Sequence, residues 1–189
     1  MKPIEGYDLI TEAGEFKPLP AMIVGVRITN VVDVPENQYL EVYCDITKGE
    51  YANYFKTLVD NGLKDTSRSI RSYKQTALPF FKAFITAIEK SNPGYQWDWD
   101  EKKLIGKGVI AVFGQEEYLD KEGNIRISTK VVEFRSLEAF EAGRIKLPEL
   151  KKLTAEEIKR WHDENMPNVN TSLPSGTNLP VIDEKDLPF

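Results

Sequence analysis

Basic and aromatic side chains gather in one stretch of the chain, between residues 51 and 82. The part from Lys64 to Lys82 contains a single acid, Asp65, against five cations: Lys64, Arg68, Arg71, Lys74 and Lys82. Tyr73 lies among these cations, and four more residues of the same kinds come just before them: Tyr51, Tyr54, Phe55 and Lys56. Cations pair with phosphates, and aromatic rings stack on bases of any sequence. The stretch therefore predicts a surface that binds single-stranded nucleic acid.

Residues 38–47 alternate between apolar and polar side chains, as expected for a half-buried strand. One face carries Tyr39, Glu41, Tyr43 and Asp45, and the other carries Leu40, Val42, Cys44 and Ile46. Tyr39 and Tyr43 are therefore added to the expected binding surface. Arg126 and Lys130, on a later strand, are second-rank candidates. The alternative is that the basic residues form a solvated loop and the tyrosines only cover a sheet edge.

Two further aromatic residues, Trp97 and Trp99, stand among the acids Asp98, Asp100 and Glu101. These acids repel phosphate, so we expect the tryptophans to be structural. The same carboxylates could bind a hard cation, as in a metal-dependent nuclease. A solvated turn is the more frequent outcome for such a run of acids.

Composition limits the remaining chemistry. The 189 residues carry a net charge of −5, so a nucleic-acid site must be a local basic patch. The single cysteine, Cys44, and the single histidine, His162, exclude a disulfide framework and any usual zinc site. No glycine-rich phosphate loop, nucleophile elbow or catalytic triad is recognisable. We therefore expect no enzyme activity, no cofactor and no metal.

The periodicity predicts three strands, a helix and two more strands within residues 1–153. The expected strands cover 21–34, 38–47, 50–55 (extended again over 69–74), 103–117 and 124–135, with a short helix over 136–142. The main helix covers 76–90, with Thr76 as its N-cap and Pro79 in its first turn. This order, β-β-β-α-β-β, is that of an OB-fold, a five-stranded barrel that often binds single strands. The expected class is mainly β, or α+β.

The C-terminal part divides into a helix, a linker and an acidic tip. Thr154 and Glu157 form a capping box that begins a helix over 154–165. Residues 166–182 contain 11 residues of Pro, Asn, Ser, Thr or Gly and no charge, so we expect a flexible linker. The tip offers an aromatic anchor, a terminal carboxylate and acids that attract a basic patch; it consists of Asp183, Glu184, Asp186, Leu187, Pro188 and Phe189, with Lys185 between the acids.

The tip resembles the acidic C-terminal end of bacterial and phage single-stranded DNA-binding proteins, which other replication and repair proteins bind. Lys185 departs from that pattern and weakens its electrostatic part. The whole chain resembles a family from phages and prophages of Gram-positive bacteria, in residues 12–16, in residues 39–51 and in the helix over 77–90 that is followed by Asn-Pro-Gly. Members lie among replication and recombination functions and are often taken as single-stranded DNA-binding proteins.

The expected function is therefore sequence-independent binding of single-stranded DNA in phage replication or recombination, with the tip recruiting partner proteins. The expected location is the cytoplasm of the host bacterium, away from the membrane. Two alternatives remain: a recombination-mediator adaptor without tight DNA binding, and the nuclease mentioned above. The sequence leaves self-association open.

Overall fold

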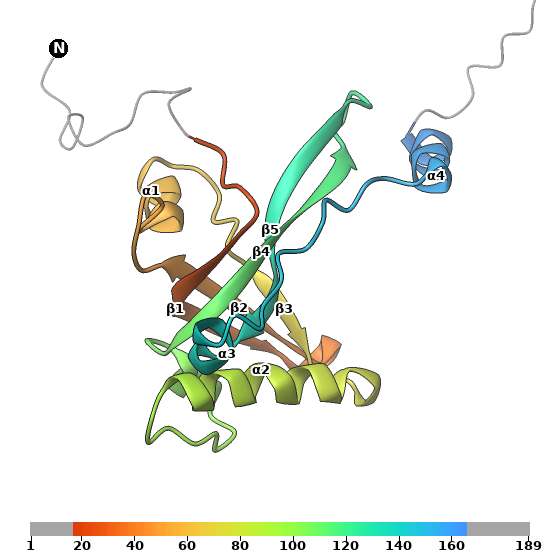
Figure 1. The fold of residues 1–189 in the computed structure, drawn as a ribbon. Helices are drawn as coiled ribbons and strands as arrows, with labels where there is room; N and C mark the ends of the chain where they lie inside the picture. Colours follow the sequence, from red (N-terminus) through yellow and green to blue (C-terminus); the bar gives the residue numbers. More distant parts are fainter. Residues whose placement is uncertain (1–16, 166–189) are drawn as a thin grey trace, which may run out of the picture. The chain divides into compact units, whose positions relative to one another are not determined.

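The computed structural model describes residues 17–165, in two compact units divided between Leu153 and Thr154. The first unit is built on one antiparallel sheet of five strands in the order β3-β2-β1-β4-β5 (Figure 1). The predicted α+β class is confirmed. The predicted linker over 166–182 and the tip residues Asp183, Glu184, Asp186, Leu187, Pro188 and Phe189 lie outside the described residues.

Strand β1 (Met22–Val34) belongs to both halves of the sheet. Its first half pairs with β4 (Gly108–Leu119), from Met22 opposite Phe113 to Arg27 opposite Gly108. Its second half pairs with β2 (Tyr39–Ile46), and the register shifts between Ile28 and Asn30. Such a bulge bends a strand and increases its twist. Because of this bend, β1 can pair with both halves of the sheet, although the two halves face different ways.

The sheet does not close into the expected barrel. Its edges are β3 (Ser69–Ser72) and β5 (Ile125–Arg135), which share no ladder. Strand β3 is only four residues long, so it offers few groups for a closing ladder. The Arg71 guanidinium lies instead over the ring of Phe134 on β5, 4.6 Å from its centroid. A side-chain contact therefore bridges the seam where a barrel would have hydrogen bonds.

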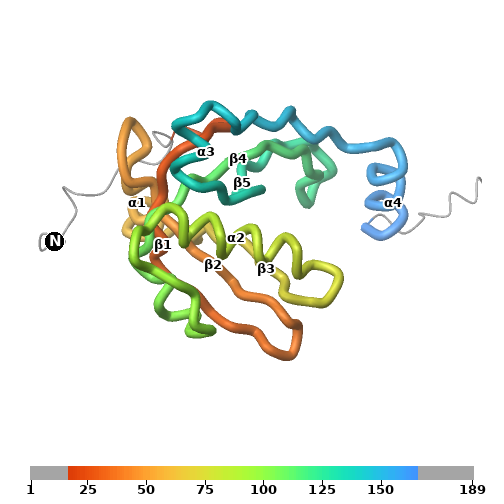
Figure 2. Tube along the Cα trace, turned by 60° about the horizontal axis from the view of Figure 1, so that its bottom comes forward, coloured from red at the N-terminus to blue at the C-terminus, as the bar shows by residue number. Residues whose placement is uncertain are grey.

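The main helix, α2 (Leu78–Ser91), packs at the open end of the curved sheet (Figure 1). Viewed from that end, α2 runs between the half made of β1, β2 and β3 and the half made of β4 and β5 (Figure 2). Its apolar stripe is buried as predicted at Phe81, Phe84, Ile85 and Ile88, whereas Leu78 is exposed. The prediction that Thr76 caps this helix is wrong: a 3-10 turn (Gln75–Ala77) precedes it, and Ala77 is the N-cap.

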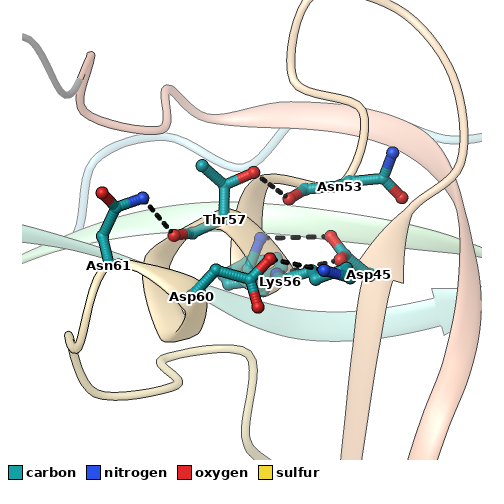
Figure 3. A network of polar contacts seen from close by, with 7 residues as sticks. Asp45, Asn53, Lys56, Thr57, Asp60 and Asn61 are labelled. Atoms are coloured by element: carbon teal, nitrogen blue, oxygen red, sulfur yellow. Dashed lines mark hydrogen bonds and ion pairs between the residues drawn. The ribbon is translucent and has the colours of Figure 1, made fainter. Parts of the chain in front are cut away.

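The prediction of a strand over residues 50–55 is wrong, because the chain forms helix α1 (Tyr54–Asp60) there. The Asp45 carboxylate accepts hydrogen bonds from the backbone N–H groups of Phe55 (3.1 Å) and Lys56 (3.0 Å), as Figure 3 shows for Lys56. An acid at a helix N-terminus satisfies donors that have no partner within the helix. Asp45 is thus buried, and not on the exposed face predicted for it. The third strand is the later extended segment, β3.

The remaining predictions differ mainly in their boundaries. Strand β4 begins at Gly108 and not at 103, because a 3-10 helix (Glu101–Leu104) and a turn at Gly106, with φ 83°, come first. Helix α3 (Leu137–Glu141) begins after its N-cap Ser136. Beyond Met22, where β1 begins, the backbone of Lys151 pairs with the free edge of β4 at Gln115 and Glu117.

The second unit contributes α4 (Ala155–Asn165) to the described residues. Its predicted capping box is confirmed. The Thr154 backbone N–H donates to Glu157 Oε2 (2.9 Å), and the Glu157 N–H donates to Thr154 Oγ1 (3.2 Å).

Candidate nucleic-acid interface

The side of β1, β2 and β3 that faces away from α2 carries half-buried tyrosines beside exposed apolar side chains. We call this surface the outer sheet face and define it by seven residues: Asn30, Val32, Tyr39, Glu41, Tyr43, Arg68 and Ile70. The register places Glu41 between Val32 on β1 and Ile70 on β3. Ile70 exposes 50% of its surface and Val32 exposes 41%. The outer sheet face therefore offers flat rings and apolar surface on which bases could stack.

The charge at the centre of the outer sheet face is neutralised internally. Glu41 forms an ion pair with the exposed Arg68 and accepts a hydrogen bond from the Tyr43 hydroxyl (2.9 Å). The Arg68 hydrogen bond, more than the Tyr43 bond, holds the pKa of Glu41 below its usual value. Burial raises the pKa of Tyr43, and Glu41 adds to the shift. A phosphate must therefore compete with Glu41 for Arg68.

Two predicted binding residues point into the protein. Phe55 exposes only 3% of its surface, and its ring stacks on Phe113 in the core. Arg71 follows the alternation of β3 inward, where Ser69 Oγ accepts from its guanidinium (2.6 Å) and the guanidinium lies over the rings of Phe84 and Phe134. Burial lowers the pKa of Arg71 to about 10. Neither side chain is placed to touch DNA in this structure.

Tyr51 and Tyr54 lie near Phe55 and not on the outer sheet face. Their rings contact each other edge to face, at 5.9 Å between centroids, and both pack against the core. The Tyr54 ring also meets Phe55 edge to face at 5.2 Å. These contacts give both tyrosines a structural role at the start of α1.

The other predicted cations differ in whether an acid neutralises them. Three form ion pairs: Lys56 with Asp60, Arg126 with Asp120, and Lys130 with Glu116. Hydrogen bonds from the Asn124 backbone, the Arg126 side chain and other groups lower the pKa of Asp120 to about 2. Lys64 and Lys74 are exposed and have no acidic partner within residues 17–165. Both are therefore available to phosphate.

Tyr73 belongs to a different surface. Its hydroxyl donates to Asp33 Oδ1 (2.8 Å), and its ring meets Phe81 edge to face. It helps to line a cleft of about 690 Å³, which we call the aromatic cleft; the other lining residues are Asp33, Leu40, Leu78, Phe81, Lys82, Ile85, Thr86, Glu89, Trp97, Trp99 and Glu101. The predicted cluster is therefore split between two surfaces.

The two tryptophans, for which the sequence predicted a structural role, differ in burial. Trp97 is half-buried and its ring packs edge to face on Phe81. Trp99 exposes 82% of its surface, and its backbone has φ 69°. A non-glycine residue in this left-handed region costs about 1–3 kcal/mol and often marks a functional site. Trp99 is therefore an exposed ring on a strained backbone, which the sequence did not predict.

The acids beside the tryptophans are held by a lysine. Asp98 and Asp100 both form ion pairs with Lys103, and the Asp98 bond lowers the pKa of that carboxyl. Across residues 17–165, no group of three or more His, Cys, Asp or Glu side chains is arranged to hold a metal ion.

Comparison with known proteins adds no relative. No protein-family model matches the chain, and no curated protein matches it significantly. Among the described helices, none has the length and apolar character needed to cross a bilayer.

Proposed function

We propose that the chain binds single-stranded DNA without strong sequence preference, through the outer sheet face. The observation that carries the proposal is the pair Tyr39 and Tyr43, presented beside Ile70 and Arg68 on one side of a curved five-stranded sheet. Stacking on aromatic and apolar side chains is the usual source of sequence-tolerant affinity for single strands. Duplex DNA keeps its bases stacked inside and gains little from such a surface.

The topology supports the proposal. The main helix lies between the third and fourth strands, and β1 serves both halves of the sheet. We infer an OB-like fold that is opened along the seam between β3 and β5, with Arg71 in place of the closing ladder. In OB-folds, the second and third strands supply much of the surface that binds nucleic acid.

Lys64 and Lys74 complete the proposed site. Both are exposed, and they stand before and after β3 (Ser69–Ser72) in the sequence. We propose that they contact the phosphate backbone of a strand whose bases lie on the tyrosines. Few cations take part, so the salt dependence of binding should be shallow.

The resemblance of the tip extends the proposal to partner proteins. We propose that Leu187, Pro188 and Phe189 recruit replication or recombination proteins, as the resemblance to phage single-stranded DNA-binding proteins implies. The acids Asp183, Glu184 and Asp186 would guide the tip to a basic patch on the partner.

A recombination-mediator adaptor without tight DNA binding is the second candidate. The net charge of −5 and the ion pair between Arg68 and Glu41 favour it. The nuclease alternative gains no support, because Asp98 and Asp100 are engaged by Lys103.

The test is fluorescence anisotropy of labelled oligo-dT and of a duplex of equal length, titrated with the full chain over a range of salt concentrations. We expect clear binding of oligo-dT, weaker binding of duplex, and affinity that falls as salt rises. Absence of oligo-dT binding would favour the adaptor, and equal affinity for duplex would contradict the proposed site. Cleavage of the oligonucleotide in Mg²⁺ or Mn²⁺ would instead indicate the nuclease.

A further inference from the structure

The aromatic cleft is elongated along α2. Six of its lining residues come from that helix: Leu78, Phe81, Lys82, Ile85, Thr86 and Glu89. From residue 78 to residue 89, an α-helix advances about 16 Å, the length of about five residues of extended peptide. The other lining residues include Trp97, Trp99 and, from the β1–β2 hairpin, Asp33 and Leu40. These dimensions suit a segment of chain better than a compact ligand.

The chemistry of the aromatic cleft combines apolar, aromatic and acidic groups. Leu40, Phe81 and Ile85 supply buried apolar surface. The rings of Trp97 and Trp99 lie 6.1 Å apart, and Trp99 is the more exposed of the two. Lys82 is the single cation among the lining residues, against the three carboxylates of Asp33, Glu89 and Glu101.

Two of the carboxylates are fixed in place by hydrogen bonds. Asp33 Oδ1 accepts from the Tyr73 hydroxyl (2.8 Å), and Glu89 Oε1 accepts from the Trp97 backbone N–H (2.9 Å). Each carboxylate keeps a second oxygen that no described residue engages. Carboxylates held in this way attract a cation without losing much side-chain freedom, and a nearby indole face adds cation–π attraction.

We propose that the aromatic cleft binds an extended segment of a partner protein in which Lys or Arg stands next to a large apolar side chain. The apolar side chain packs on Leu40, Phe81 and Ile85, and the cation lies against Trp99 within reach of Glu101. An excess of carboxylates disfavours a nucleic-acid strand here, because phosphates would be repelled. The proposal stands independently of DNA binding by the outer sheet face.

The test begins with a random peptide library displayed on yeast and selected on immobilised full-length protein, in parallel with the Trp99→Gly variant. Glycine removes the ring and suits the positive φ at this position. We expect the wild-type chain, and not the variant, to enrich peptides that combine Lys or Arg with Leu, Phe or Trp. No enrichment, the same peptides from both proteins, or enrichment of acidic or uncharged peptides would overturn the proposal.

An enriched peptide is then titrated by tryptophan fluorescence in the full chain carrying Trp161→Phe, which leaves only Trp97 and Trp99. Glu101→Lys should weaken the peptide about tenfold by reversing a charge in the cleft. Glu149→Lys makes the same charge change at an exposed position outside the cleft and should change the affinity by less than about twofold.

Two outcomes of the titration would overturn the proposal. Equal weakening by both charge reversals would mean that only the overall charge matters. Quenching of Trp99 by oligo-dT, strengthened by Glu101→Lys, would assign the cleft to nucleic acid. If Trp99→Gly does not fold, the comparison of the two glutamate variants still decides.

Discussion

The outer sheet face and the aromatic cleft both present aromatic rings but differ in the charges beside them. On the outer sheet face, Tyr39 and Tyr43 lie beside Arg68, whose one acidic partner is Glu41. In the cleft, Trp97 and Trp99 lie among Asp33, Glu89 and Glu101. Aromatic side chains supply contact area in both places. The sign of the surrounding charge then decides whether a phosphate or a cation can bind beside the ring.

The comparison also shows why position along the chain is a poor guide to the surface that a residue joins. Arg71, Tyr73 and Lys74 are near neighbours in sequence. Arg71 points into the protein, Tyr73 lines the aromatic cleft, and Lys74 is exposed beside the end of β3. A basic and aromatic stretch can therefore contribute to a core, a cleft and an interface within four residues.

The largest difference between the two surfaces is expected from removing the tyrosines. The double variant Tyr39→Ala with Tyr43→Ala should lose about 1–3 kcal/mol of oligo-dT binding free energy per ring. Binding of a basic peptide in the aromatic cleft should not change. Anisotropy with labelled oligo-dT measures the first effect and tryptophan fluorescence the second. The matched control, Tyr39→Phe with Tyr43→Phe, keeps the rings and should keep the affinity; an equal loss in the control would point to the hydroxyl groups instead.

A smaller effect, on stability and not on binding, is expected at Arg71. Arg71→Ala leaves a gap over the rings of Phe84 and Phe134 and should lower the free energy of unfolding by about 2 kcal/mol. Arg71→Met fills the gap without a buried charge and should recover most of that loss. Urea unfolding of the two variants gives both values. Oligo-dT affinity of the folded variants should match wild type, and a large loss in both would place Arg71 in the interface after all.

The smallest effect is expected from releasing Arg68. Glu41→Gln removes the competing carboxylate, so oligo-dT binding should strengthen by about twofold to fivefold, the scale of an exposed ion pair. The matched variant Glu116→Gln on β4 releases Lys130 on β5 in the same way and should have no effect if DNA lies on the outer sheet face. A stronger response to Glu116→Gln would move the site to the hairpin of β4 and β5.

The pH dependence of the same pair has a definite sign. The pKa of Glu41 is lowered in the folded state, chiefly by Arg68. The contribution of the pair to stability is therefore fully present above the ordinary carboxyl pKa of about 4.3 and is lost as pH falls through the lower folded value. Near neutral pH the pair stays intact, so only the Glu41→Gln variant reveals the released Arg68.

Local periodicity predicted much of the fold. The alternation in β2 identified its buried and exposed faces correctly, except at Asp45, and the apolar stripe of α2 was correct from Phe81 to Ile88. Helix α1 was missed because the carboxylate that accepts hydrogen bonds from its first N–H groups belongs to Asp45, which lies on a neighbouring strand. The open seam was missed because element order does not reveal whether edge strands pair.

The candidate site was harder to predict, because pairing with acids depends on residues far away in sequence. Glu41 and Arg68 are 27 residues apart, and Lys130 and Glu116 are 14 apart. One signal in the sequence was available. If side chains alternate between the two faces of the sheet through β3, Arg68 and Ile70 fall on one face and Ser69 and Arg71 on the other. For Trp99, the acidic neighbours led to the prediction of a structural ring and not an exposed one. No local residue pattern indicated its positive φ.

The pairing of β1 with both β2 and β4 also has a consequence for how the chain folds during synthesis. Its second half can pair with β2 as soon as residue 46 has been made, since both belong to one hairpin. Its first half, Met22–Arg27, must wait for residues 108–113. Pairings of such sequence separation form slowly, and an unpaired strand edge invites association with other chains. We expect nascent chains that stop before β4 to depend on chaperones, and their aggregation to begin at Met22–Arg27.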